Sequence, residues 1–201
     1  MADSTSQEPS HPPALQAPWR LPYLENMPQS TPTHSSAGSF LRAYWLSPDD
    51  DRTNHVILRT AEGLILLNAY PYANGHLLVA LGEARPTLHE YTAIERAALW
   101  RLVDLAAAIM ERALSPQGIN IGINQGRAAG AGVPEHLHAH LVPRWSGDVN
   151  FMSVVGHIRV IPAPLEAMAA RYARTIEAMR QNWPSELPPI TGPASAAPGA
   201  E

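Results

Sequence analysis

The sequence contains no cysteine, so disulfides, thiol catalysis, iron–sulfur clusters and cysteine-based zinc sites are excluded. It also has no excess of positive charge, because 14 lysine and arginine residues against 18 aspartate and glutamate residues give a net charge of −4. Binding of nucleic acid through bulk positive charge is therefore not expected. No apolar run approaches the roughly 18 residues that cross a bilayer, so no membrane partner is expected. The first residues lack the basic and apolar segments of a secretory signal, and we expect a cytoplasmic protein.

The length of 201 residues suits one globular domain with a tail at each end. Residues 1–18 and 184–201 are rich in proline and small residues and have few large apolar side chains. Such segments cannot bury enough surface to become ordered. We therefore predict that both ends are disordered tails and that residues 19–183 form the domain.

Apolar periodicity in the body predicts an α+β fold with a mainly antiparallel sheet of about five strands. A long helix is predicted over 87–114, starting at a capping box of Thr87 and Glu90, and a C-terminal helix over 165–179. The predicted strands are residues 55–60, 64–70, 76–82, 119–125 and 136–143, with 157–162 a candidate for a further short strand. The apolar face predicted for the long helix consists of Tyr91, Ile94, Ala98, Leu102, Leu105 and Ile109.

The stretch "PEHLHAHLVPRW" places a histidine at every second position of the last predicted strand. Because side chains alternate between the two faces of a strand, His136, His138 and His140 should project from one face. Neighbouring histidines are then roughly 6–7 Å apart along the strand. Three histidines in register favour a functional site over polar filler on a half-exposed strand.

One interpretation of this histidine row is a metal site. Two histidines two positions apart on a strand can both reach zinc, with a third ligand from elsewhere. His76 or Glu135 could supply that ligand, although Glu135 should face away from the row. The protein would then be a metal-dependent hydrolase.

The glycines before the row favour a second interpretation, a phosphate site. Gly126, Gly130 and Gly132 let backbone N–H groups approach an anion closely. Their spacing is superficially that of a dinucleotide-binding fingerprint, but Pro134 and a strand follow where that motif needs a helix. A neutral imidazole is a good nucleophile toward phosphorus, and it is abundant near neutral pH because its pKa is about 6.5.

The row and its surroundings resemble the histidine-triad family of nucleotide hydrolases and transferases. Residues 136–142 match the family signature His-φ-His-φ-His-φ-φ, where φ is an apolar residue. "LLNAYPYANGHLLVA" is similar to the family's stretch from an asparagine to a Gly-His pair, and "NQGRAAGAG" to its glycine loop. "HLVPRWSGDVNF" resembles the branch of diadenosine tetraphosphate phosphorylases and fragile-histidine-triad hydrolases. The resemblance covers residues 19–181.

This resemblance implies cleavage of a diadenosine polyphosphate or related nucleotide conjugate at its α-phosphate. His138 would attack the phosphorus and form a nucleotidyl-histidine, which water or phosphate then cleaves. His140 and His76 would lie beside the phosphates, and His136 would orient the nucleophile. The alternatives are the metal-dependent hydrolase and a nucleotide-binding interaction protein with incidental turnover.

The resemblance also implies the groups that bind the substrate. Asn68 matches a position that binds ribose hydroxyls, Gln125 an amide that contacts phosphate, and Gly130 and Gly132 belong to the glycine loop. Asn124 and Gln125 should point to opposite strand faces, so only one of them faces the row. The spacing to the row favours Gln125.

No cofactor is expected to be required, although Mg²⁺ can accompany a polyphosphate substrate. Some relatives have a cysteine motif that joins a structural zinc site, and "THSSAGSF" occupies the comparable region here without cysteine. Val133 stands where some relatives carry a hydroxyl residue near the phosphate, so the source of the leaving-group proton stays open. The resemblance further implies a homodimer.

Overall fold

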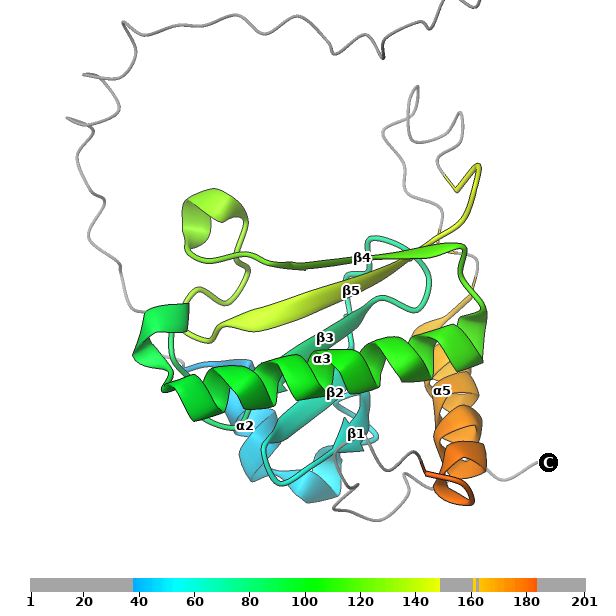
Figure 1. Ribbon diagram of the computed structural model, residues 1–201, viewed down its shortest axis with the longest axis horizontal. Helices are drawn as coiled ribbons and strands as arrows, with labels where there is room; N and C mark the ends of the chain where they lie inside the picture. The colour runs from blue at the N-terminus through cyan, green and yellow to red at the C-terminus, as the bar shows by residue number, and fades with distance from the viewer. Residues whose placement is uncertain (1–37, 149–160, 162, 184–201) are drawn as a thin grey trace, which may run out of the picture. The chain divides into compact units, whose positions relative to one another are not determined.

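The structure is a computed structural model that describes residues 38–148, 161 and 163–183. The predicted tails, residues 19–37 and nearly all of the candidate strand 157–162 lie outside these described residues. The helices are α2 (Phe40–Leu46), α3 (Ala93–Leu114) and α5 (Leu165–Arg180) (Figure 1). The strands are β1 (Val56–Arg59), β2 (Gly63–Leu67), β3 (Leu77–Leu81), β4 (Gly118–Ile123) and β5 (His138–Arg144). Short 3₁₀ turns are η2 (Pro48–Asp50), η3 (Leu88–Glu90) and η4 (Arg127–Ala129).

The strands form one sheet in the order β1-β2-β3-β5-β4, and every neighbouring pair is antiparallel. This confirms the predicted α+β fold with a five-stranded antiparallel sheet. In the central pair, Leu78 lies opposite His140 and Ala80 opposite His138. On the other side of β5, Gly122 of β4 lies opposite His140. The histidines thus lie near the middle of the sheet.

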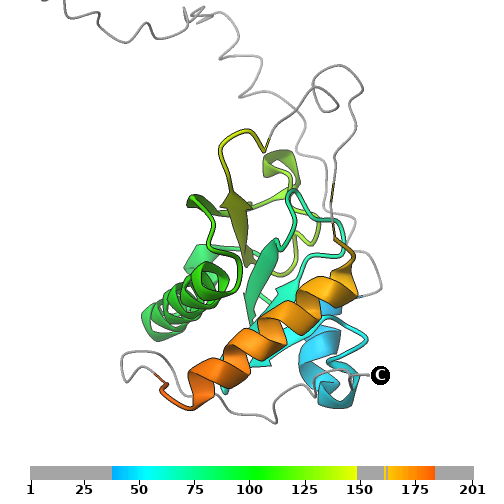
Figure 2. The same ribbon diagram turned by 90° about the vertical axis from the view of Figure 1, so that its right-hand side faces the viewer.

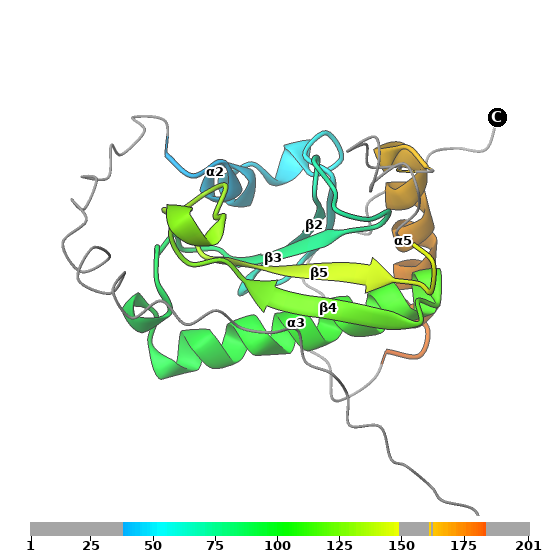
Figure 3. The ribbon, with the colours of Figure 1, turned by 90° about the horizontal axis from the view of Figure 1, so that it is seen from above.

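Helices cover the two faces of the sheet unequally, as Figure 3 shows with α2 on one side and α3 on the other. The α3 side holds the main core, in which Leu102 and Ile109 pack against Val79 and Ala139. α5 packs beside α3 and against β1 (Figure 2). On the opposite face, Leu41 of α2 packs with a smaller apolar cluster that consists of Val56, Leu64, Leu66, Leu78 and Ala80. None of the described helices is long and apolar enough to span a membrane.

The long helix begins later than the sequence predicted. Its N-cap is Thr92, whose side chain accepts from the Glu95 N–H, while the Glu95 carboxylate accepts from the Thr92 N–H. The predicted start at Thr87 is wrong, because residues 88–90 form a separate 3₁₀ turn and Tyr91 is extended. Both four-residue stretches fit a capping box, and the second is the one that precedes the helix. Ile94 was predicted to face the core, but it lies in the first helical turn and is 80% exposed.

The loop between β2 and β3 is held by α5. Gly75 has a φ of +83°, which side-chain-bearing residues rarely adopt, and a Cβ added there would lie 2.5 Å from Leu114 Cδ1, so glycine is favoured. The Gly75 carbonyl accepts a hydrogen bond of 2.7 Å from the hydroxyl of Tyr172, a buried residue of α5. Because His76 follows Gly75 directly, the C-terminal helix helps to fix the position of that histidine.

Candidate functional site

Two of the three histidines in the row lie on β5, and the third precedes it. His138 and His140 pair with Ala80 and Leu78, which belong to the α2 side of the sheet, so both imidazoles project to that side. The sequence predicted that His136 begins the strand, but it lies in the turn before β5. Hydrogen bonds, and not strand alternation, set its orientation.

His136 is fully buried and bonded at both ring nitrogens. Its Nε2 lies 2.9 Å from the Leu81 carbonyl, which can only accept, so the proton is on Nε2. Its Nδ1 lies 2.8 Å from Ser39 Oγ and accepts the serine proton. Burial lowers the pKa of His136 to about 4, which keeps the ring neutral. Sequence reasoning missed Ser39, because 97 positions separate it from His136.

His138 has the protonation form that a nucleophile needs. Its Nδ1 lies 2.8 Å from the backbone carbonyl of His136, so Nδ1 donates its proton there. The other nitrogen, Nε2, then carries a lone pair, and no residue in the described ranges is bonded to it. Burial lowers the pKa of His138, so the neutral form dominates at physiological pH.

His76 and His140 form a second hydrogen-bonded pair. The Tyr72 backbone N–H donates to His76 Nδ1 at 3.1 Å, and Asn68 Nδ2 lies 3.2 Å from the same atom. His76 therefore has its proton on Nε2, which lies 3.0 Å from His140 Nδ1 and donates to it. That bond leaves the proton of His140 on Nε2. Burial, and then the charge of nearby His138, lower the pKa of His140 to about 4.

The Nε2–H of His140 is a buried donor without an acceptor in the described part of the chain. A buried donor left unpaired is unfavourable, and such groups are uncommon in folded proteins. The ring centres of His138 and His140 are 4.9 Å apart. The site therefore holds a lone pair on one ring beside a hydrogen-bond donor on the next. A phosphate group could accept a hydrogen bond from His140 Nε2–H while the lone pair of His138 Nε2 attacks its phosphorus.

Asn68 lies at the site but is engaged with the loop. Its Nδ2 contacts His76, and its Oδ1 accepts from the Tyr70 backbone N–H at 2.9 Å. The amide thus fixes the chain around His76 in this structure. Its predicted contact with ribose hydroxyls stays a prediction.

The structure does not bring Gln125 to the row. Its side chain is exposed, and its Oε1 accepts from the Leu88 backbone N–H at 3.0 Å. The pairing of Gly122 with His140 puts even-numbered residues of β4 on the histidine side, and Asn124 directly follows the strand. Asn124 Nδ2 lies 3.7 Å from the place that a Cβ on Gly130 would take. Strand parity therefore favours Asn124, and the predicted phosphate contact of Gln125 stays a prediction.

The glycine loop is a folded turn and not a loose connector. Gly126 and Gly130 have φ values of +84° and +89°, which side-chain-bearing residues rarely adopt. The Gly130 N–H donates to the Arg127 carbonyl at 2.9 Å, so it closes η4 and does not point to a phosphate here. Gly132 is exposed, with nothing within 4 Å of an added Cβ. A phosphate contact at Gly132 stays a prediction.

The metal-site interpretation gains no support from the geometry. Within residues 38–148, 161 and 163–183, no group of three or more His, Asp or Glu side chains is placed to hold a metal ion. Both ring nitrogens of His136 and of His76 already have hydrogen-bond partners. Either ring would have to lose a hydrogen bond before it could ligate a metal.

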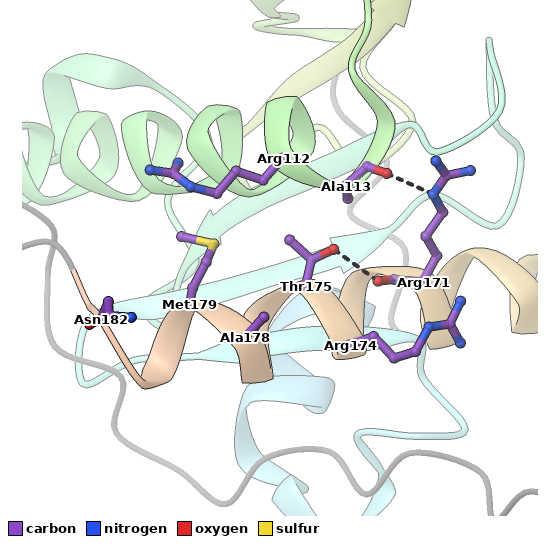
Figure 4. Close-up of a pocket in the computed structure, with 8 residues that line it drawn as sticks. All are labelled: Arg112, Ala113, Arg171, Arg174, Thr175, Ala178, Met179 and Asn182. Atoms are coloured by element: carbon purple, nitrogen blue, oxygen red, sulfur yellow. Dashed lines mark hydrogen bonds between the residues drawn. The ribbon is translucent and has the colours of Figure 1, made fainter.

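A cavity of about 670 Å³ lies elsewhere, between the end of α3 and α5 (Figure 4). Arg112, Arg171 and Arg174 line it, and Figure 4 shows their guanidinium groups pointing in different directions. Arg171 Nε donates to the Ala113 carbonyl at 2.6 Å and so pairs with the end of α3. These arginines do not converge on one ligand position, and the histidines remain the candidate site.

The part of the chain that holds the histidines matches known proteins. The HIT domain family model matches residues 50–147. An AP-4-A phosphorylase of Mycobacterium tuberculosis is 34% identical over 164 residues, which are 80% of this chain and 84% of that protein. An asymmetrical bis(5'-nucleosyl)-tetraphosphatase of Schizosaccharomyces pombe is 35% identical over 97 residues, 48% of this chain and 53% of that protein.

Solved structures show the same fold. A hypothetical histidine triad nucleotide-binding protein from Sulfolobus tokodaii superposes with a TM-score of 0.56 at 21% identity, covering 70% of this chain and 95% of that one. The NitFhit protein of Caenorhabditis elegans gives a TM-score of 0.51 at 27% identity, covering 63% of this chain and 27% of that one. The chain belongs to the HIT-domain family, the histidine-triad proteins that its sequence resembles.

Proposed function

We propose that the protein cleaves diadenosine polyphosphates, such as diadenosine tetraphosphate, at the α-phosphate through a nucleotidyl-histidine on His138. The observation that carries this proposal is the pair of protonation forms at the site. His138 Nε2 has a lone pair, and His140 Nε2–H is a donor without an acceptor among the described residues. The names of the Mycobacterium and Schizosaccharomyces relatives support this substrate class.

In the first step, His138 Nε2 forms a bond to the α-phosphorus. The bond from phosphorus to the bridging oxygen breaks, and its electron pair leaves with the nucleoside polyphosphate. The imidazole becomes positively charged, and its Nδ1–H then donates a stronger, charge-assisted bond to the His136 carbonyl. His140 Nε2–H stabilises the charge that develops on the phosphate oxygens. Covalent catalysis divides one difficult displacement into two easier ones.

In the second step, water or inorganic phosphate attacks the nucleotidyl-histidine and restores the free imidazole. Because His138 supplies the nucleophile and His140 a hydrogen-bond donor, we propose that no bound cofactor is required and that Mg²⁺ arrives with the polyphosphate. From the family relationship we further propose a cytoplasmic homodimer. A solution mass of one chain across micromolar concentrations would contradict the dimer.

The proposal is tested with diadenosine tetraphosphate, supplied with and without inorganic phosphate, and by identifying the products. AMP with ATP indicates hydrolysis, and ADP with ATP indicates phosphorolysis. We expect His138→Ala to lower either reaction by several powers of ten, each worth about 1.4 kcal/mol of barrier. The matched control is His89→Ala, since His89 is an exposed histidine in η3. Near-normal turnover by His138→Ala would contradict the proposal.

A further inference from the structure

The loop between β2 and β3 carries two large aromatic side chains that are not buried. Tyr70 is 86% exposed and Tyr72 is 47% exposed. The loop itself is fixed by backbone contacts, because the Tyr70 N–H donates to Asn68 and the Tyr72 N–H to His76. A rigid loop that presents tyrosines to solvent at the edge of a polar site suggests that a ligand covers at least one of them.

Tyr72 continues the line of rings that begins at the nucleophile. The centre of the His140 ring is 4.9 Å from that of His138, and the Tyr72 ring is 5.9 Å from His140 at an angle of only 14°. The Tyr72 ring also lies 4.8 Å from that of His76. Tyr70 has no such ring contact among the described residues. The two tyrosines of one loop thus differ in their relation to the site.

In the proposed mechanism the leaving group lies on the His140 side of the α-phosphorus. His140 Nε2–H is a buried donor beside the nucleophile that lacks an acceptor in the described ranges, and the leaving oxygens are where negative charge accumulates. The Tyr72 ring is the next in the line after His140. A leaving polyphosphate that extends along His140 therefore brings its terminal nucleoside toward Tyr72.

We propose that Tyr72 stacks against the nucleobase of the leaving nucleotide and makes the enzyme prefer dinucleoside over mononucleoside polyphosphates. This inference rests on the proposed function, because it names a second base-binding position in the same site. Bases stack well on exposed tyrosine rings, and stacking tolerates any base because each has a flat π face. The leaving base is therefore bound with little discrimination among adenine, guanine and pyrimidines.

The test compares kcat/KM for diadenosine tetraphosphate and for adenosine 5'-tetraphosphate. Both are attacked at the same α-phosphorus, and only the first has a nucleoside on its leaving group. We expect Tyr72→Leu to reduce the preference for the dinucleotide about tenfold, within the range for loss of one base–aromatic stack. Tyr72→Phe keeps a flat ring and should keep the preference. The backbone N–H that contacts His76 is present in every variant.

The matched control is Tyr70→Leu, which removes the other tyrosine of the loop and should leave the preference unchanged. If Tyr72→Leu lowers kcat/KM equally for both substrates, the ring only supports the histidines and the inference is wrong. An equal loss of preference in Tyr70→Leu would also overturn it. If the wild type forms no nucleotidyl-histidine with either substrate, the proposed function itself fails, and the inference fails with it.

Discussion

The two faces of the sheet have different roles, in stability and in chemistry, although alternate residues of the same strands form them. The face under α3 is apolar throughout, and its central positions Val79, Ala139 and Leu141 are fully buried. The face under α2 carries His138 and His140 beside Leu78 and Ala80. One face supplies stability through apolar burial, and the other holds polar rings that need hydrogen bonds to be buried at all.

Hydrogen bonds on the histidine face keep each buried imidazole in a single protonation form. His136 and His138 are oriented by backbone carbonyls, which can only accept, and His76 by a backbone N–H, which can only donate; His140 takes its form from its bond to His76. These contacts hold His138 with a lone pair on Nε2 and His140 with a proton on Nε2. Backbone groups thus fix the form of His138 directly, and that of His140 through the His76 side chain.

Truncation of the α3 face should have the largest effect on stability and little effect on chemistry. Leu102→Ala removes a fully buried side chain from the centre of α3 and should lower the free energy of unfolding by about 2–5 kcal/mol. Turnover per folded molecule should stay near that of the wild type. Urea unfolding and active-site titration measure the two quantities. A large loss of turnover in the folded variant would show that the two faces are not separable.

Acidification should lower the free energy of unfolding, because the buried histidines resist protonation. Burial lowers the pKa of His136 and of His140 to about 4, whereas in the unfolded chain both titrate near the ordinary value of 6.5. Between these values the unfolded state binds protons that the folded state does not, so stability falls as pH falls from 6.5 toward 4. Above 6.5 this contribution is fully present. Each histidine can contribute a slope of up to about 1.4 kcal/mol per pH unit.

Urea unfolding at a series of pH values from 7.5 to 4.5 measures this dependence. The exposed His89 gives the matched control, because His89→Ala should leave the slope unchanged. A free energy of unfolding that is flat between pH 6.5 and 5 would mean that the buried rings are not held neutral.

A smaller effect is expected from Ser39, whose side chain links the start of α2 to His136. Ser39→Ala removes the donor to His136 Nδ1 and also the N-cap of α2, whose Arg42 N–H bonds to Ser39 Oγ. An unsatisfied buried acceptor costs about 1–3 kcal/mol. Ser39→Thr keeps the hydroxyl and is expected to recover most of the stability. Equal losses in the two variants would show that packing, and not the hydroxyl, matters at this position.

Much of this fold was predictable, because strands such as β2 and β3 are short apolar runs and the long helix has an apolar face at helical spacing. These patterns can be recognised within each segment of the sequence. The start of α3 was not, since Thr87–Glu90 and Thr92–Glu95 fit the same capping pattern. Helix propensity and a four-residue motif do not distinguish them, and tertiary packing does.

The candidate site was predictable only in part. The alternation of histidines placed His138 and His140 on one face of β5. The contact between Ser39 and His136 joins residues 97 positions apart, and no local pattern in the sequence indicates it. The choice between Asn124 and Gln125 depends on the register of β4 against β5, which only the pairing of Gly122 with His140 reveals.

The central claim is that the fold holds the site histidines in fixed protonation forms, and ¹⁵N NMR of histidine-labelled protein at pH 7 tests it most directly. We predict a neutral His138 with its proton on Nδ1, and neutral His76, His136 and His140 with their protons on Nε2. The His138→Ala variant assigns the first signal by its loss. A His138 that is charged, or that carries its proton on Nε2, would contradict the account, because the lone pair that attacks phosphorus would then be absent.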